Sequence, residues 1–158
     1  MNSWKQHFDF GGFMKVLLGL VLVLFAVAVG SLFYLGQKSQ AGAAPGLQSS
    51  QLAACPSSPN CVRSESDTPQ EQRVESFPVE IWSQIASAVS DMGGKITRQE
   101  EDYIAAEFTS SLFKFTDDVE FRRSDDAVHV RSASRVGHSD LNANKARVED
   151  LRDRLTQR

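Results

Sequence analysis

Hydrophobic positions divide the chain into an apolar run, a polar segment without periodicity, and a region where apolar and polar residues alternate. The run from Val16 to Leu35 contains no charged residue and is dominated by Leu and Val. At about 1.5 Å of rise per residue it forms a helix about 30 Å long, which matches the hydrocarbon core of a bilayer. Aromatic residues lie on both sides of the run, as expected at two membrane interfaces: Trp4, Phe8, Phe10, Phe13, Phe33 and Tyr34. This pattern predicts one transmembrane helix, residues 16–35, in contact with membrane lipid.

The charges that flank the apolar run predict its orientation. Lys5 and Lys15 precede it, against a single acidic residue, Asp9. The positive-inside rule then places residues 1–15 in the cytoplasm and the C-terminal domain on the far side of the membrane. We therefore expect a single-pass protein of a bacterial inner (cytoplasmic) membrane with a periplasmic domain.

Two processed forms are alternatives to a retained anchor. A signal peptide has an apolar core of about 7–15 residues with small residues directly after it. Here the core is longer, and Ala41-Gly42-Ala43 lies several polar positions downstream. The sequence Leu52-Ala53-Ala54-Cys55 resembles a lipoprotein cleavage box, but residues 36–54 separate its cysteine from the apolar run. The longer core and this separation favour a retained anchor.

The segment after the anchor, residues 36–54, is rich in Ala, Gly, Ser and Gln and has no hydrophobic periodicity, so it is expected to be a flexible linker. The chain's two cysteines, Cys55 and Cys61, follow it. Their spacing is not that of a zinc knuckle, a thioredoxin-like pair or a c-type haem site. Two prolines and an asparagine between them favour a tight turn, and hence a structural disulfide. A catalytic redox pair is the alternative, although the electropositive setting that it needs is not evident nearby.

Residues 55–158 are predicted to form one α+β domain. A helix is expected at residues 78–92, with Ile81, Ile85, Val89 and Met92 on one face. A second helix is expected from Asp140 to Gln157, with a narrow apolar face made of Leu141, Asn144, Val148, Leu151 and Leu155.

Strands fill the space between the two expected helices. Lys95–Gln99 and Tyr103–Thr109 read as a hairpin, and alternation resumes between Phe113 and Phe121 with a bulge expected at Asp117-Asp118. Ser124–Asp126 reads as a turn before a last strand around residues 128–132. The result is a two-layer domain with about four antiparallel strands and flanking helices, behind one N-terminal transmembrane helix.

Charge argues against one class of partner. Lys5, Asp9, Lys15 and Lys38 are the only charged side chains before Arg63, so 14 of the 17 basic and 19 of the 20 acidic residues lie in the domain. An acidic domain lacks the basic surface that binds a phosphate backbone, so no nucleic-acid partner is expected.

The densest polar segment runs from Arg131 to Asp140. It combines two guanidinium groups, a Gly turn and the start of a helix, which together suit a carboxylate or phosphate. The ligand-binding candidates are Arg131, Ser132, Ser134, Arg135, His138 and Asp140, with Asp117 and Asp118 on the neighbouring strand. The alternative is structural, in which the two arginines pair with Asp117, Asp118 or Glu120.

Residues in and beside this segment also carry the atoms of two other kinds of site. His138, Asp140, Asp117 and Asp118 carry metal-ligand atoms, but they show no close ligand spacing, and no metal or other cofactor is expected. Ser132, Ser134 and Ser139 lack a Gly-x-Ser-x-Gly elbow, so a hydrolase is a weaker interpretation and no catalytic residue is assigned.

Three separated motifs carry a resemblance to a known family: Cys55–Val62, Phe115–Glu120 and Arg131–Leu141. Over about Cys55 to Leu155 the chain resembles a mainly bacterial family, domain of unknown function 1499. Family members commonly have Gly where this chain has Asn142, and Arg is frequent at the position of Lys145. The resemblance implies an envelope-facing domain, often behind an anchor or signal, and implies that the acidic strand and the arginine strand belong to one site.

These observations lead to three hypotheses about function. The first is a non-enzymatic accessory or scaffolding subunit of a membrane-protein complex. The second is a binding module for a small molecule or lipid headgroup at the Arg131–Asp140 segment. The third is an enzyme, such as a hydrolase that uses His138 with Asp140 or Asp118.

Overall fold

The computed structural model describes residues 10–156, which belong to two compact units divided between Tyr34 and Leu35. Trp4, Phe8, most of the expected cytoplasmic segment and Gln157 therefore lie outside the described residues. The first unit contains most of helix α1, Phe10–Gln40, which includes the predicted span and continues beyond both of its ends. Among the described residues this is the one helix long and apolar enough to cross a membrane, and a signal sequence would have the same character.

The second unit is an α+β domain built on a six-stranded antiparallel sheet in the order β3-β8-β7-β6-β5, with β4 also paired to β8. A separate two-stranded hairpin consists of β1 and β2. The strands are β1 (Leu47–Gln48), β2 (Gln51–Leu52), β3 (Cys61–Arg63), β4 (Phe77–Pro78), β5 (Lys95–Gln99), β6 (Tyr103–Thr109), β7 (Thr116–Arg123) and β8 (Ala127–Ser134). The helices of this unit are α2 (Trp82–Asp91), α3 (Ala143–Thr156) and two 3-10 turns, η1 (Gln70–Gln72) and η2 (Val79–Ile81).

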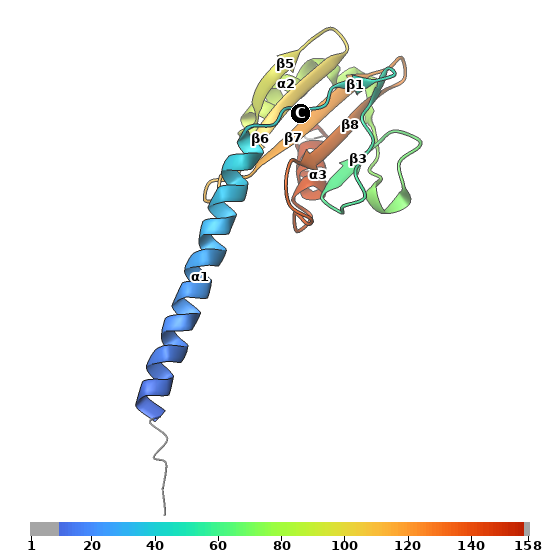
Figure 1. Ribbon diagram of the computed structural model, residues 1–158. Coiled ribbons are helices and arrows are strands. Elements are labelled where there is room, and N and C mark those ends of the chain that lie inside the picture. Colours follow the sequence, from blue (N-terminus) through green and yellow to red (C-terminus); the bar gives the residue numbers. More distant parts are fainter. Residues whose placement is uncertain (1–9, 157–158) are drawn as a thin grey trace, which may run out of the picture. The chain divides into compact units, whose positions relative to one another are not determined.

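The two faces of the sheet are covered differently (Figure 1). Helices α2 and α3 pack on one face, here called the helix face, where alternate residues of β6, β7 and β8 form the apolar core. This core includes Ile104, Val119, Phe121, Val128 and Val130 from the sheet, and Ile85, Val89, Val148 and Leu151 from the helices. The opposite face, here called the outer face, is crossed by residues 39–54, here called the covering segment.

The covering segment differs from the flexible linker expected at residues 36–54. Leu52 and Ala53 are buried, and Leu52 packs with Tyr103 and Ala105 of the outer face. No hydrophobic period predicts this attachment, because the segment is held mainly by hydrogen bonds between its backbone and the side chains of Glu65, Glu120 and Arg135.

Most predicted elements are confirmed, and the differences have local causes. The bulge expected at Asp117-Asp118 is wrong, since β7 pairs without interruption and the register shift lies in β5 between Ile96 and Arg98. Leu141 was expected on the apolar helix face, yet it precedes α3, has φ +54° and is exposed. Asp140 nevertheless caps α3, because its carboxylate accepts hydrogen bonds from the backbone N–H groups of Asn142 and Asn144.

Candidate functional site

The residues expected to form one site lie on two opposite faces of the sheet. Successive side chains of a strand point to opposite sides, so Asp117 lies on the helix face and Asp118 on the outer face. Ser132 and Ser134 likewise point toward α3, while Arg131 and Arg135 contact the acidic side chains of the outer face. The single candidate site therefore separates into two polar clusters.

The cluster on the helix face is organised by Asn144, which is fully buried in the first turn of α3. The hydroxyl of Ser132 donates to its side-chain oxygen at 2.6 Å. The Asn144 amide nitrogen donates to the Ser134 hydroxyl at 3.0 Å and to the Asp140 carboxylate at 2.7 Å. These bonds fix the start of α3 against the end of β8.

A second residue of α3, Arg147, joins this cluster to β7. Its guanidinium pairs with Asp117 at 2.6 Å and donates to the Ser132 hydroxyl at 2.9 Å. It also lies over the ring of Phe108 at 4.7 Å. Neither Arg147 nor Asn144 was among the predicted site residues, because their helical period reads as ordinary surface and core positions.

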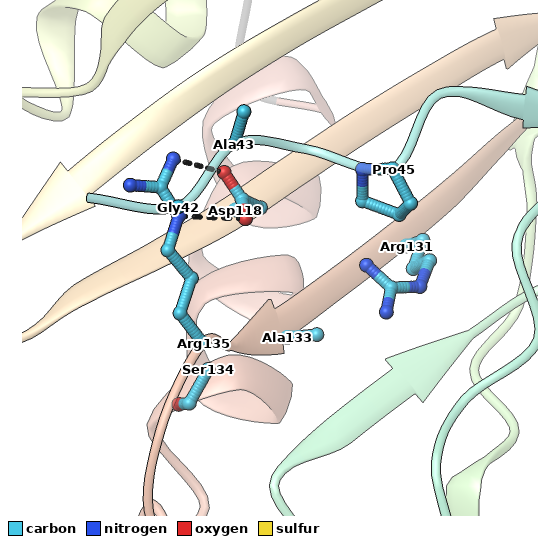
Figure 2. A pocket seen from close by; sticks show the side chains of 8 residues that line it. All are labelled: Gly42, Ala43, Pro45, Asp118, Arg131, Ala133, Ser134 and Arg135. Carbon is cyan, nitrogen blue, oxygen red and sulfur yellow. Dashed lines mark hydrogen bonds and ion pairs between the residues drawn. The ribbon is translucent and has the colours of Figure 1, made fainter. Parts of the chain in front are cut away.

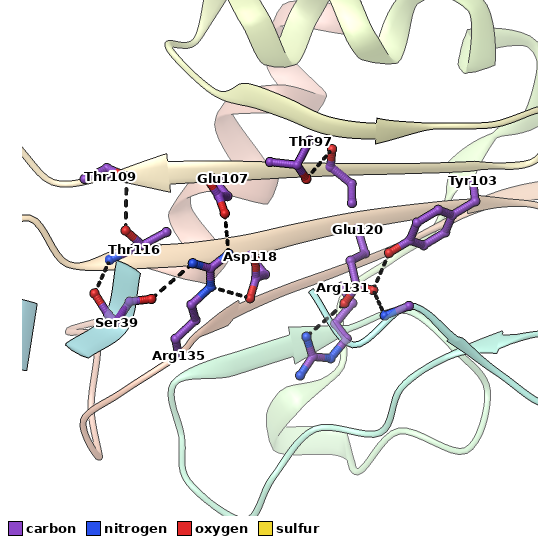
Figure 3. Close-up of polar contacts among 12 residues, drawn as sticks. Ser39, Thr97, Tyr103, Glu107, Thr109, Thr116, Asp118, Glu120, Arg131 and Arg135 are labelled. Atoms are coloured by element: carbon purple, nitrogen blue, oxygen red, sulfur yellow. Dashed lines mark hydrogen bonds and ion pairs between the residues drawn. The ribbon is translucent and has the colours of Figure 1, made fainter. Parts of the chain in front are cut away.

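On the outer face, Arg135 connects two acidic strands to the covering segment (Figure 3). Its guanidinium makes a bidentate pair with Asp118, with N–O distances of 2.8 and 2.6 Å, and a contact of 2.6 Å with Glu107. It also donates to the backbone carbonyl of Ser39 at 3.1 Å. The hydrogen bonds that Arg135 donates to Asp118 raise the pKa of Arg135 and outweigh the effect of its burial, so this group remains a cation.

Glu120 is the centre of a second outer-face network. One carboxylate oxygen accepts hydrogen bonds from the Tyr103 hydroxyl at 2.7 Å and from the backbone N–H of Gly46 at 2.9 Å. The other oxygen pairs with Arg131 at 3.0 Å. Burial raises the pKa of Glu120, although the hydrogen bonds and the charge of these three partners act to lower it. The pKa of Tyr103 is also raised, by its burial and by its hydrogen bond to Glu120.

Glu65 is the centre of a third network and holds the end of the covering segment. Its carboxylate accepts the Leu52 backbone N–H at 3.1 Å and pairs with Arg122 at 2.9 Å. The Nδ1 atom of His129 lies 3.4 Å from the same carboxylate. Burial favours a higher pKa for Glu65, but the hydrogen bonds from Arg122 and Leu52 and the charges nearby lower it on balance.

A pocket of about 290 Å³ opens between these networks, and its lining consists of Gly42, Ala43, Pro45, Asp118, Arg131, Ala133, Ser134 and Arg135. Figure 2 shows Arg131 on one side of this pocket and the Asp118–Arg135 pair on the other. Arg131 is 7% exposed, and its Nε is buried without a hydrogen-bond partner among the described residues. A guanidinium N–H with no acceptor retains the capacity to bind an anion.

The remaining candidates fall outside these networks or serve the fold. His138 is exposed in the loop between β8 and α3. Within residues 10–156 no group of three His, Cys, Asp or Glu side chains is arranged to hold a metal ion. Cys55 and Cys61 form the predicted disulfide, with Cα atoms 5.7 Å apart, and Cys61 pairs with Ala133 at the edge of the sheet.

Several residues of the outer face were missed by sequence reasoning as site residues: Glu65, Tyr103, Glu107 and Arg122. Strand alternation could have placed Glu120 beside Asp118, since the two are two positions apart in a single strand. Glu65 has no such signal, because it lies in a loop and reaches β7 only through the tertiary fold.

Residues 51–155 match the family described as "Protein of unknown function (DUF1499)". No curated protein matches the chain.

Proposed function

The chain belongs to this DUF1499 family, and from its structure we propose that it is a single-pass, membrane-anchored envelope protein that acts as a non-enzymatic accessory or scaffolding subunit of a membrane complex. In this proposal α1 is retained as the anchor, its N-terminus is cytoplasmic, and the domain is periplasmic. Membrane lipid surrounds residues 16–35, and a membrane protein is the partner of the domain.

The observation that carries this proposal is the attachment of the covering segment to the sheet. Three acidic side chains hold it. Glu120 and Glu65 accept hydrogen bonds from the backbone N–H groups of Gly46 and Leu52. Asp118 pairs with Arg135, which donates to the backbone carbonyl of Ser39. The folded domain consequently begins within a few residues of the apolar run rather than after a long tether. Such a short connection suits a protein that works beside other membrane proteins.

The same contacts favour a retained anchor over processing. Cleavage near Ala41–Ala43 would remove Ser39, whose hydroxyl accepts the Thr116 backbone N–H at 2.9 Å. Lipoprotein processing before Cys55 would remove the whole covering segment and would modify a sulfur that is paired with Cys61. The disulfide itself supports an oxidising compartment.

A structural use of the polar candidates supports the non-enzymatic assignment. The hydroxyls of Ser132 and Ser134 and the carboxylate of Asp140 all bond to Asn144 and fix the start of α3. The charged pairs of the outer face hold the covering segment in a comparable way. These groups stabilise the fold, which is the role expected of buried polar side chains that are hydrogen-bonded to one another.

Native mass spectrometry of the full-length protein, extracted from its own membrane in mild detergent, tests the proposal. We expect a defined stoichiometric complex, peptides from residues before Ser39, and a Cys55–Cys61 linkage without reduction. A lone protomer would contradict the accessory role, and a chain that begins after residue 40 would contradict the retained anchor.

A second candidate function, a binding module for a small carboxylate or phosphate, is favoured by Arg131, which lines the outer-face pocket and whose buried Nε has no hydrogen-bond partner among the described residues. Inorganic phosphate and citrate are suitable probes in a thermal-shift titration of the detergent-solubilised protein. Each anion should raise the melting temperature of the wild type but not that of Arg131→Met, measured against each protein without anion. Arg98→Gln, which changes an exposed arginine, is the matched control and should keep the shift. An equal shift in all three proteins would indicate a general salt effect and reject the pocket.

A further inference from the structure

The loop between β6 and β7, residues 110–115, packs directly against the last turn of α1. A Cβ built at Gly36 would lie 1.7 Å from the carbonyl oxygen of Phe113, so only glycine allows this approach. The Ser39 hydroxyl and the Gln40 side-chain amide both donate hydrogen bonds to the Lys114 carbonyl oxygen, at 3.4 Å. Gly36 directly follows Leu35, the last residue of the apolar run, so this loop contacts the chain one residue after the predicted span.

The side chains of this loop are those of a membrane interface. Its sequence is Ser-Ser-Leu-Phe-Lys-Phe, without an acidic residue, in a domain that is acidic as a whole. Leu112 is 65% exposed, and Phe113 and Phe115 form an edge-on ring pair with centroids 6.3 Å apart. Lys114 is exposed beside them. Apolar and aromatic groups with a flanking lysine match the boundary between acyl chains and lipid headgroups.

A second loop at the same edge of the sheet carries another exposed leucine. Thr109 pairs with Thr116 and Asp117 pairs with Ser134, so the end of β6, the start of β7 and the end of β8 share one edge. The β8–α3 loop leaves from this edge and presents Leu141, which is 91% exposed. The exposed large hydrophobic side chains in the described part of the domain are Leu47, Leu112 and Leu141, and two of the three lie here.

We propose that this edge of the domain, made of the β6–β7 and β8–α3 loops, lies in the interfacial region of the bilayer, with Leu112 and Leu141 in contact with lipid. The inference rests on the proposed retention of α1 as a membrane anchor. The domain would then be held at the membrane surface by its own side chains as well as by the covalent connection. Removing two exposed leucines from water favours this placement.

Site-directed spin labelling of the full-length protein tests the proposal. Because Cys55 and Cys61 are paired, a single added cysteine can be labelled without reductant. The variants are Leu112→Cys, Leu141→Cys, Val23→Cys within the apolar run, and Asp125→Cys in the exposed turn at the opposite edge of the sheet. Each is reconstituted at a high lipid-to-protein ratio into vesicles of phosphatidylethanolamine and phosphatidylglycerol, and its accessibility to oxygen and to a water-soluble nickel chelate is measured.

Labels at residues 112 and 141 should show an oxygen-to-nickel accessibility ratio several-fold above that at residue 125, and below that at residue 23. An aqueous signal at either 112 or 141, with residue 23 in lipid, would overturn this inference and leave the anchor intact. An aqueous signal at residue 23 would overturn the anchor and the inference together. A lipid signal at residue 125 as well would also overturn it, since the contact would not be specific to this edge.

Discussion

The helix face and the outer face of the six-stranded sheet are both buried, but they are held by different forces. On the helix face, apolar side chains of β6, β7 and β8 pack against α2 and α3. On the outer face, the same strands present Glu107, Asp118, Glu120 and Arg131 to a segment whose large apolar side chains are Leu47 and Leu52 alone. The comparison shows that the second side of a small sheet can be covered through hydrogen bonds and ion pairs when little apolar surface is available there.

This difference has energetic consequences. An apolar core gains stability from the area that it removes from water, whereas buried ion pairs recover in attraction roughly what they lose in desolvation. On the outer face, removing one member of a buried ion pair is therefore expected to lower the stability of the domain more than removing both members. The following predictions test that contrast, from the largest expected effect to the smallest.

The helix face should respond most strongly to truncation. Phe121 is fully buried against Phe77 and the core, so Phe121→Ala should reduce the free energy of unfolding by about 4 kcal/mol through lost packing and a cavity. Urea titration of the detergent-solubilised full-length protein, followed by near-ultraviolet circular dichroism, measures the change. If Phe121→Ala reduced the free energy of unfolding by less than a truncation on the outer face, Leu52→Ala, the helix face would not dominate stability.

The outer face should show coupling between charged partners. Arg131→Met leaves Glu120 buried without its cation and should cost about 3 kcal/mol in the free energy of unfolding. When Glu120→Gln is combined with Arg131→Met, residue 120 keeps an acceptor for Tyr103 and Gly46. The double variant should therefore recover most of the lost free energy of unfolding. The double-mutant cycle, measured by the same urea titration, would contradict this account if the two losses simply added.

The apolar contact of the covering segment should contribute less than the core. Leu52 packs with Tyr103 and Ala105 in a small cluster, so Leu52→Ala should cost about 2 kcal/mol, the lower end of such truncations. Proteolysis of the full-length protein should also become faster within residues 41–54. Gln51→Ala, at an exposed neighbouring position, is the control and should change neither quantity.

The smallest effect concerns pH. The lowered pKa of Glu65 means that its ionised form stabilises the fold, fully above the ordinary value of 4.5 and decreasingly as the pH falls through the lower folded value. Glu65→Gln should therefore cost about 1 kcal/mol at neutral pH, and this difference should shrink below pH 4.5. Urea titrations at several pH values measure it, with exposed Glu71→Gln as a control. A difference that is constant with pH would show that Glu65 acts by packing alone.

The elements were predictable where a hydrophobic period was present. The pattern Val119 and Phe121, interrupted by Glu120, identified β7, and the hairpin of β5 and β6 has the predicted bounds. The start of the last helix was placed too early because Leu141 and Asn142 adopt positive φ, a backbone choice that no period reveals.

The candidate site was predictable in its members more than in its arrangement. Arg131, Arg135 and Asp118 line one pocket on the outer face. Asp117, Ser132 and Ser134 lie on the other side of the sheet, and His138 is exposed in a loop. Only the strand register, which depends on partners far along the chain, separates these groups.

By itself, the sequence determined the apolar run, the α+β class, the short disulfide loop and the acidic character of the domain, because each depends on composition or local spacing. The tertiary structure alone decided that residues 39–54 cover the sheet and that Glu120 and Glu65 accept hydrogen bonds from the backbone N–H groups of Gly46 and Leu52. The physical reason is the separation along the chain of the residues that interact. Hydrophobic periodicity records which side of an element is buried, whereas a backbone hydrogen bond to a distant carboxylate leaves no mark on the residues that supply it.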